Sequence, residues 1–165
     1  RWCFDLACSA TKGNPLTMQT RAAAPEDCAA LLALIAEMAA HHGDTSGASA
    51  ETLGRDVLSA QPWLPVIVAV DQGKLIGYAA LTPNVQLQLG LRSMDLHHLF
   101  VTAAHRGKGH GRALLTAAIA QAKAAGCAYL TVGTSGDNLA AQQFYQAQGF
   151  TSNPPSSRRF RFSFD

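Results

Sequence analysis

Glycines alternate with basic or polar residues between positions 106 and 112, directly before apolar residues at helical spacing. Glycine lets backbone N–H groups come close to an anion, and the start of a helix carries partial positive charge. The stretch therefore predicts an anion site, and a flexible basic turn without a ligand is the alternative. Its spacing matches neither a Walker A loop nor the dinucleotide pattern GxGxxG. The residues of this glycine loop are Arg106, Gly107, Lys108, Gly109, His110, Gly111 and Arg112.

A tyrosine in the segment 137–149 is a second candidate for chemistry. Helical spacing predicts that Phe144 joins Ala140 and Ala147 on the buried face of a helix. Tyr145 then lies about 100° round the helix axis, at the border of that face. From there its hydroxyl could reach a cleft, and a tyrosine that only packs is the alternative.

The elements that must hold these residues follow from periodicity and from turn and cap signals. Strands are predicted at 17–21, over the hairpin 64–81, and at 92–101, 128–133 and 159–164. Helices are predicted at 24–42, at 49–59 with Ser49 as N-cap, from the glycine loop to Gly126, and at 137–149 with Asp137 or Asn138 as cap. The order βααβββαβαβ predicts an α+β domain with a mixed sheet over residues 18–165. We expect residues 1–17 to be an extension ahead of a natural start at Met18, with an ordered arm on a neighbour as the alternative.

Composition narrows the classes of function. Of the 165 residues, 48% are hydrophobic and 15% charged, which predicts a soluble globular domain. The formal charge of +2 is too small to indicate nucleic acid, and no apolar run has membrane-spanning length. Asp5 interrupts what would be the apolar core of a signal peptide. The four cysteines lack metal-ligand spacing and are typical of a reducing compartment, so we expect a cytoplasmic protein without a bound metal.

The glycine loop and the 137–149 helix, with its pattern Asn138, Ala141, Phe144-Tyr145, Gly149-Phe150, together resemble the GNAT superfamily of N-acetyltransferases over residues 18–165. The resemblance implies a mostly antiparallel, twisted sheet with splayed central strands and flanking helices. It also implies acetyl-coenzyme A as acyl donor, coenzyme A as product, direct transfer in a ternary complex, and a homodimer. By match of position, the glycine loop binds the pyrophosphate, the backbone of Leu99, Phe100 and Val101 lines the acyl-pantetheine arm, Asn138 lies on the cofactor side, and Tyr145 is the general acid.

The resemblance leaves the base open, and His97 is our candidate. It precedes Leu99 by two residues, and a histidine can be neutral at working pH. His97 and His98 are expected on opposite faces of their strand, so only one of them could enter the site directly, and they would be poor joint metal ligands. A structural histidine pair without a catalytic role is an equal alternative.

The chain is most similar to the spermidine/spermine and thialysine acetyltransferase branch, but it departs from that branch at two places. His41-His42 stands where the branch carries tyrosine-glutamate, and His97-His98 where it carries glutamate-aspartate, acids that suit a polycation. We therefore expect a small amine that bears a carboxylate, with His98, His42, Arg92 and the group Arg158, Arg159 and Arg161 as candidate anion partners. A protein acetyltransferase and a non-catalytic acyl-coenzyme A sensor are the alternatives, and Tyr145 argues against the sensor.

Overall fold

The computed structural model describes residues 18–152, and the chain divides into two compact units, Arg1–Val132 and Gly133–Asp165. The expected extension 1–17, the strand expected at 159–164 and the arginines at 158, 159 and 161 lie outside the described residues.

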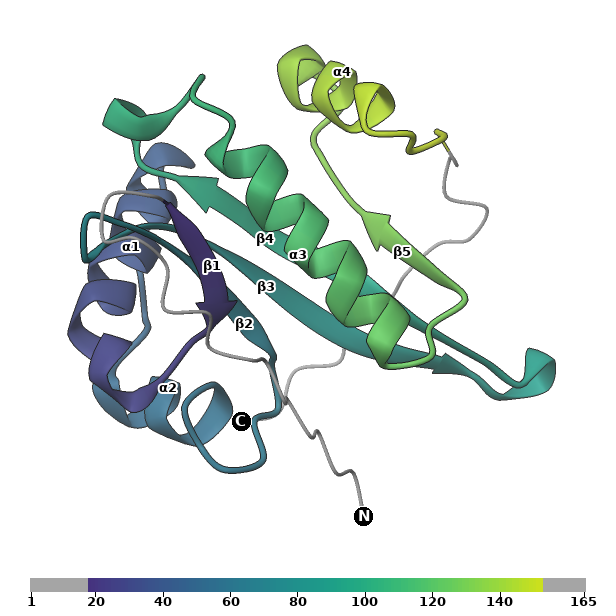
Figure 1. The fold of residues 1–165 in the computed structure, drawn as a ribbon, viewed down its shortest axis with the longest axis horizontal. Coiled ribbons are helices and arrows are strands. Elements are labelled where there is room, and N and C mark those ends of the chain that lie inside the picture. Colours follow the sequence, from purple (N-terminus) through teal and green to yellow (C-terminus); the bar gives the residue numbers. More distant parts are fainter. Residues whose placement is uncertain (1–17, 153–165) are drawn as a thin grey trace. The chain divides into compact units, whose positions relative to one another are not determined.

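Within the described part of the first unit, five strands form one sheet in the order β1-β2-β3-β4-β5 (Figure 1). The pairs β1–β2, β2–β3 and β3–β4 are antiparallel, and β5 runs parallel to β4. This confirms the mixed, mostly antiparallel sheet of the predicted α+β fold. The strands are β1 Gln19–Ala22, β2 Val66–Asp71, β3 Lys74–Gln86, β4 Leu91–Val101 and β5 Tyr129–Val132.

Strand β3 is longer than the sequence predicted, and it forms a second hairpin with β4. β3 continues past residue 81 to Gln86, and its last residues pair with the start of β4. A short 3₁₀ turn, Leu87–Leu89, and Gly90 at φ 62° reverse the chain. The extension contains a proline at position 83, and its one large apolar residue, Val85, is exposed, so periodicity gave no signal for it.

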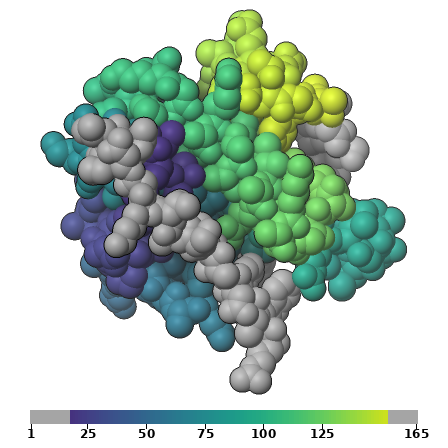
Figure 2. Space-filling view, viewed as in Figure 1, coloured from purple at the N-terminus to yellow at the C-terminus, as the bar shows by residue number. Residues whose placement is uncertain are grey.

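Helices cover both faces of this sheet. Between β1 and β2 come a 3₁₀ turn Pro25–Asp27, α1 Cys28–His41 and α2 Ala50–Asp56, and α3 His110–Ala124 lies between β4 and β5. Alternate residues of β2 pack with α1 and α2, while α3 lies over the opposite face and runs along β4 in the foreground of Figures 1 and 2. The α1–α2 side of the core consists of Leu31, Leu34, Leu53, Val57, Val66, Val68, Val70, Tyr78, Ala80 and Phe100.

An ion pair between a buried carboxylate and a partly exposed guanidinium fixes the start of α1 to β1. Asp27 is only 4% exposed, and both of its oxygens accept hydrogen bonds from the Arg21 guanidinium at 2.5 and 2.8 Å. The same carboxylate accepts from the backbone N–H of Ala24 at 2.8 Å. Asp27 therefore closes the turn and pairs with a neighbouring strand at once.

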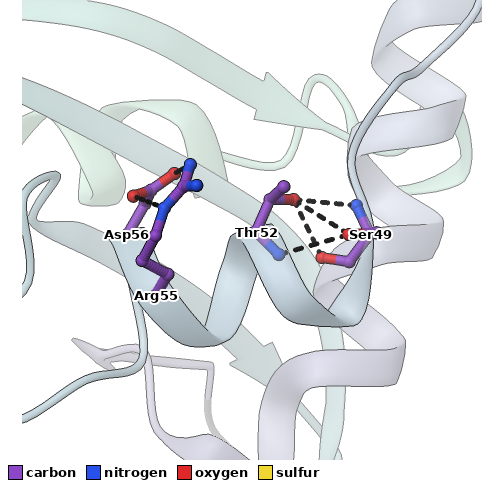
Figure 3. A network of polar contacts seen from close by, with 4 residues as sticks. All are labelled: Ser49, Thr52, Arg55 and Asp56. Carbon is purple, nitrogen blue, oxygen red and sulfur yellow. Dashed lines mark hydrogen bonds and ion pairs between the residues drawn. The ribbon is translucent and has the colours of Figure 1, made fainter.

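The start of α2 confirms the predicted cap. Ser49 accepts a hydrogen bond from the Thr52 N–H at 3.2 Å, and Thr52 Oγ1 accepts from the Ser49 N–H at 2.9 Å (Figure 3). Two backbone donors at the helix end are thereby satisfied. One turn later, Arg55 and Asp56 form an ion pair on the surface.

The described part of the second unit contains α4, Leu139–Ala147. Asn138 is its N-cap and accepts from the Ala141 N–H at 3.1 Å, which settles the choice between Asp137 and Asn138. The expected buried face was wrong, because Ala140 and Ala147 are exposed and no residue of α4 is buried. No helix of residues 18–152 is long and apolar enough to span a membrane.

Candidate active site

The two histidines of β4 lie at a bulge. Ala80 pairs with His98 and Leu81 with Leu96, so His97 is the extra residue of β4. A bulge interrupts the alternation of side chains, because two residues stand opposite one. The rings of His97 and His98 stack, with centroids 4.3 Å apart and an interplanar angle of 27°. The expectation that they occupy opposite faces was therefore wrong.

Beyond the bulge, β4 parts from β5. Pairing between the two strands covers Ser93–Leu96 of β4 and ends at Val132 of β5. Among the described residues, the edge from His97 to Val101 that would face β5 has no strand partner. Strand backbone without a partner presents N–H and C=O groups, so this edge can bind an extended polar chain.

The glycine loop follows at the end of that edge. Gly107 and Gly109 have left-handed φ angles of 75° and 87°, and no atom lies within 4 Å of the place where a Cβ would stand. Gly109 is the N-cap of α3 and provides no side-chain hydrogen bond, so the first N–H groups of the helix are not capped by it. This open helix start fits an anion such as a diphosphate.

Two cations of the loop are tied to the backbone that surrounds it. Arg106 donates through Nε to the Val101 carbonyl at 2.9 Å, and its guanidinium carbon lies 5.7 Å from the centre of the Phe100 ring. Lys108 donates to the Ala104 carbonyl at 3.1 Å. Both side chains are exposed, so their remaining donors can reach a ligand.

The histidines near the loop are partly buried. His105 contacts the Thr102 hydroxyl through Nδ1 at 2.8 Å, and its ring centroid lies 6.1 Å from that of His110. His110 Nδ1 is a buried nitrogen without a hydrogen-bond partner in the described structure. A polar ligand at the helix start would give this nitrogen a hydrogen-bond partner.

Four histidines form a cluster between β4 and the end of α1: His41, His42, His97 and His98. His98 is half-buried, and burial together with its neighbours His97 and His42 lowers its pKa to about 4. His42 is exposed, and its ring lies 5.5 Å from that of His41. His98 is therefore neutral at neutral pH.

Arg92 is not part of this cluster. It is exposed and lies six residues before His98 on β4, which at about 3.3 Å per residue is roughly 20 Å along the strand. Tyr78, which the sequence did not mark as a site residue, contacts the cluster instead: its hydroxyl lies 3.4 Å from His98 Nδ1 and donates to Met38 Sδ at 3.0 Å. The only signal for it was a tyrosine inside an otherwise apolar strand.

Tyr145 belongs to the second unit. Its ring contacts those of Phe144 and Phe150, with centroids 5.3 and 5.7 Å away, and it is half-buried. Burial raises the pKa of the Tyr145 phenol above its usual value. The phenol is therefore protonated at neutral pH and able to donate a proton. Within residues 18–152, no three His, Cys, Asp or Glu side chains gather as metal ligands.

A mostly antiparallel sheet that opens beside its parallel strand, with an uncapped helix start and two cations at the opening, is the architecture of an acyltransferase domain. The chain belongs to the acetyltransferase (GNAT) family, whose profile matches residues 30–150. The placement in the spermidine/spermine branch stays a prediction.

Curated relatives align with parts of the chain. The L-methionine sulfoximine/L-methionine sulfone acetyltransferase of Salmonella typhimurium is 33% identical over 87 residues, 53% of this chain and 50% of the relative. The L-amino acid N-acyltransferase MnaT of Escherichia coli is 33% identical over 86 residues, 52% and 49% of the two chains. A mycothiol acetyltransferase of Streptomyces coelicolor is 29% identical over 140 residues, 84% and 42%. The chain thus spans half or less of the length of these relatives.

Solved structures agree with the fold. An integron cassette protein of V. cholerae matches with a TM-score of 0.74 and 23% identity, covering 91% of this chain and 94% of the other. An aminoglycoside acetyltransferase from a soil metagenomic sample, solved with sisomicin, matches with a TM-score of 0.74 and 19% identity, covering 90% and 97%. Identities this low support the fold and not a substrate.

Proposed function

We propose that this protein is an acetyl-coenzyme A-dependent N-acetyltransferase that modifies the primary amine of a small molecule, by direct transfer in a ternary complex. One observation carries the proposal: the unpaired edge of β4 from His97 to Val101 ends at the open start of α3. An extended acyl-pantetheine arm along that edge would bring its diphosphate to the helix start.

The residues present fit acetyl-coenzyme A. Gly107 and Gly109 leave space where side chains would block the backbone, and Arg106 and Lys108 add positive charge beside it. When bound, acetyl-coenzyme A supplies the thioester carbonyl that an amine can attack. The residues proposed to bind it are Leu99, Phe100, Val101, Arg106, Gly107, Lys108, Gly109, His110, Gly111, Arg112, Asn138 and Tyr145.

Three groups of this chain would accept a proton, stabilise the oxyanion and donate a proton during the transfer. An amine must lose a proton before it attacks, because its pKa is about 10. We propose the exposed His97 as the group that takes this proton, directly or through water. A backbone N–H near Leu99 on the unpaired edge would stabilise the oxyanion. Tyr145, protonated at neutral pH, would donate to the leaving thiolate.

The acceptor is proposed to be an amino acid or a similar amine with a carboxylate. Two relatives are named for the acetylation of methionine sulfoximine and of L-amino acids. The histidines at positions 42 and 98 also avoid the acidic surroundings that a polyamine would require. Arg92 is a predicted anion partner from the sequence, and its place on β4 puts it roughly 20 Å along the strand from His98.

The test is the release of coenzyme A thiol against a panel of L-amino acids and their sulfone analogues, polyamines and N-terminal peptides. Turnover with the amino acids alone is the expected result. Turnover with polyamines or peptides would overturn the substrate class, and binding of coenzyme A without turnover would identify a sensor. The homodimer and the cytoplasmic location expected from the sequence would be tested by light scattering and by cell fractionation.

A further inference from the structure

Tyr78 places a hydroxyl in the core directly beneath the histidine cluster. The residue is 1% exposed and belongs to the apolar cluster under α1 and α2. In the described structure its hydroxyl has two polar neighbours, Met38 Sδ at 3.0 Å and His98 Nδ1 at 3.4 Å. A buried tyrosine hydroxyl needs a partner, so both contacts matter for where its single proton goes.

The two neighbours differ in what they can do. A thioether sulfur only accepts a hydrogen bond, whereas an imidazole nitrogen either accepts or donates, depending on the tautomer. All three groups are satisfied only if Tyr78 donates to the sulfur and the oxygen accepts from Nδ1–H of His98. The shorter contact to the sulfur agrees with this direction. The proton of neutral His98 then lies on Nδ1, and the lone pair on Nε2.

The Nε2 atom of His98 can take up a ligand. No described residue forms a hydrogen bond with it. It is also not a buried nitrogen of the kind found in His110, so it is accessible to solvent. It lies on β4 where the pairing with β5 ends, next to the unpaired edge. A lone pair at that place can accept a hydrogen bond from an amine.

We propose that Tyr78 and Met38 are positioning residues that hold His98 as the Nδ1–H tautomer, so that its Nε2 accepts a hydrogen bond from the acceptor amine. The second half of this statement rests on the proposed function. A site built in this way would favour an acceptor amine that is neutral or carries a single charge. His98 would orient this amine while His97 takes its proton.

The surroundings keep His98 neutral, as this role requires. The groups that face it are His97 on its own strand, Tyr78 on β3 and His42, the residue that follows α1. None of the three is acidic, and burial disfavours the imidazolium. Protonation of His98 would remove the lone pair, so binding of the amine through Nε2 should fail only well below neutral pH.

The tautomer is measurable by long-range ¹H–¹⁵N correlation on ¹⁵N-histidine-labelled protein, with His98 assigned by comparison with His98→Gln. A pyridine-type resonance at Nε2 in the wild type supports the proposal, and one at Nδ1 overturns it. Met38→Leu removes the sulfur acceptor, so the Tyr78 hydroxyl should turn to Nδ1 and the tautomer should become Nε2–H. An unchanged spectrum in Met38→Leu would overturn the role of Met38. Tyr129→Phe, which removes a hydroxyl that contacts Gln86, is the matched control and should change nothing.

Kinetics test the proposed hydrogen bond between His98 Nε2 and the acceptor amine. Met38→Leu turns Nε2 into a donor, so KM for the amine should rise about five-fold, the effect of one neutral hydrogen bond, while KM for acetyl-coenzyme A stays the same. Equal changes in both constants would overturn the contact with the amine. A protein without turnover on any amine would refute the proposed function and with it this contact, but the tautomer would still be read from the spectrum.

Discussion

Replacing Gly77 by alanine tests the packing that carries the unpaired edge. Gly77 lies on β3 opposite Val101, the last residue of β4. A Cβ at this position would collide with the Phe100 carbonyl oxygen and stand 3.1 Å from Val101 Cα. Both obstacles are backbone atoms, which cannot rotate away, so the end of β4 must shift.

The size of the effect follows from these contacts. Overpacking a core costs about 1–3 kcal/mol, and alanine returns about 0.4–1 kcal/mol by restricting the unfolded chain. We expect a net loss of about 1 kcal/mol in the free energy of unfolding, which lowers Tm by about 2–4 °C in a domain of this size. The affinity for coenzyme A should fall as well, because Arg106 is held by the Val101 carbonyl.

Urea denaturation and calorimetry with coenzyme A would measure both effects. Gly54→Ala is the matched control: Gly54 lies inside α2, a Cβ there meets no atom within 4 Å, and alanine favours helix. This variant should gain about 0.5–1 kcal/mol and bind coenzyme A unchanged. If Gly77→Ala were as stable as the wild type, the close approach of β3 and β4 would be refuted.

Four further substitutions test the ion pair, the histidine and the proposed site. Asp27→Asn should cost about 2 kcal/mol in the free energy of unfolding, because it weakens a bidentate pair with Arg21, whereas Arg55→Ala on the surface should have no measurable effect. The hydrogen bond from Arg21 lowers the pKa of Asp27, so the stabilisation is present above the usual pKa of an aspartate and is lost as pH falls below it. Because the pKa of His98 is lowered to about 4, the free energy of unfolding should fall as pH drops from about 6.5 to 4. The loss would be about 3 kcal/mol for a fully buried ring and about half of that for this half-buried one. His98→Gln should flatten this pH dependence in urea melts at several pH values. Arg106→Ala should weaken coenzyme A binding about tenfold in calorimetry, and Lys123→Ala, in the last turn of α3 away from the glycine loop, should not. Tyr145→Phe should lower kcat about 100-fold with little change in coenzyme A affinity, and unchanged turnover would remove its role as acid.

Local signals in the sequence predicted the elements well, because caps and turns depend on neighbouring residues. Ser49 and Asn138 cap their helices as expected, and the glycines at 107 and 109 adopt the left-handed backbone that lets the chain turn into α3. The order and the mixed sheet also followed from periodicity and from the family resemblance. These features require no knowledge of what lies across the sheet.

The errors arose where distant segments decide the geometry. The bulge that stacks His97 on His98 comes from the register with Ala80 and Leu81, which the residues of β4 do not encode by themselves. The continuation of β3 to Gln86 likewise depends on its pairing with β4. On α4, periodicity predicted a buried face that the helix does not have, since a pattern of small residues does not guarantee a partner.

The sequence by itself thus determined the family, the glycine loop and the residue types available for acyl transfer, since each depends on short-range spacing. Only the tertiary structure decided which histidine is buried, which hydroxyl contacts it and where β4 loses its partner strand. Strand register and side-chain burial are set by contacts between residues far apart in the chain, and the fold alone brings Met38, Tyr78 and His98 together.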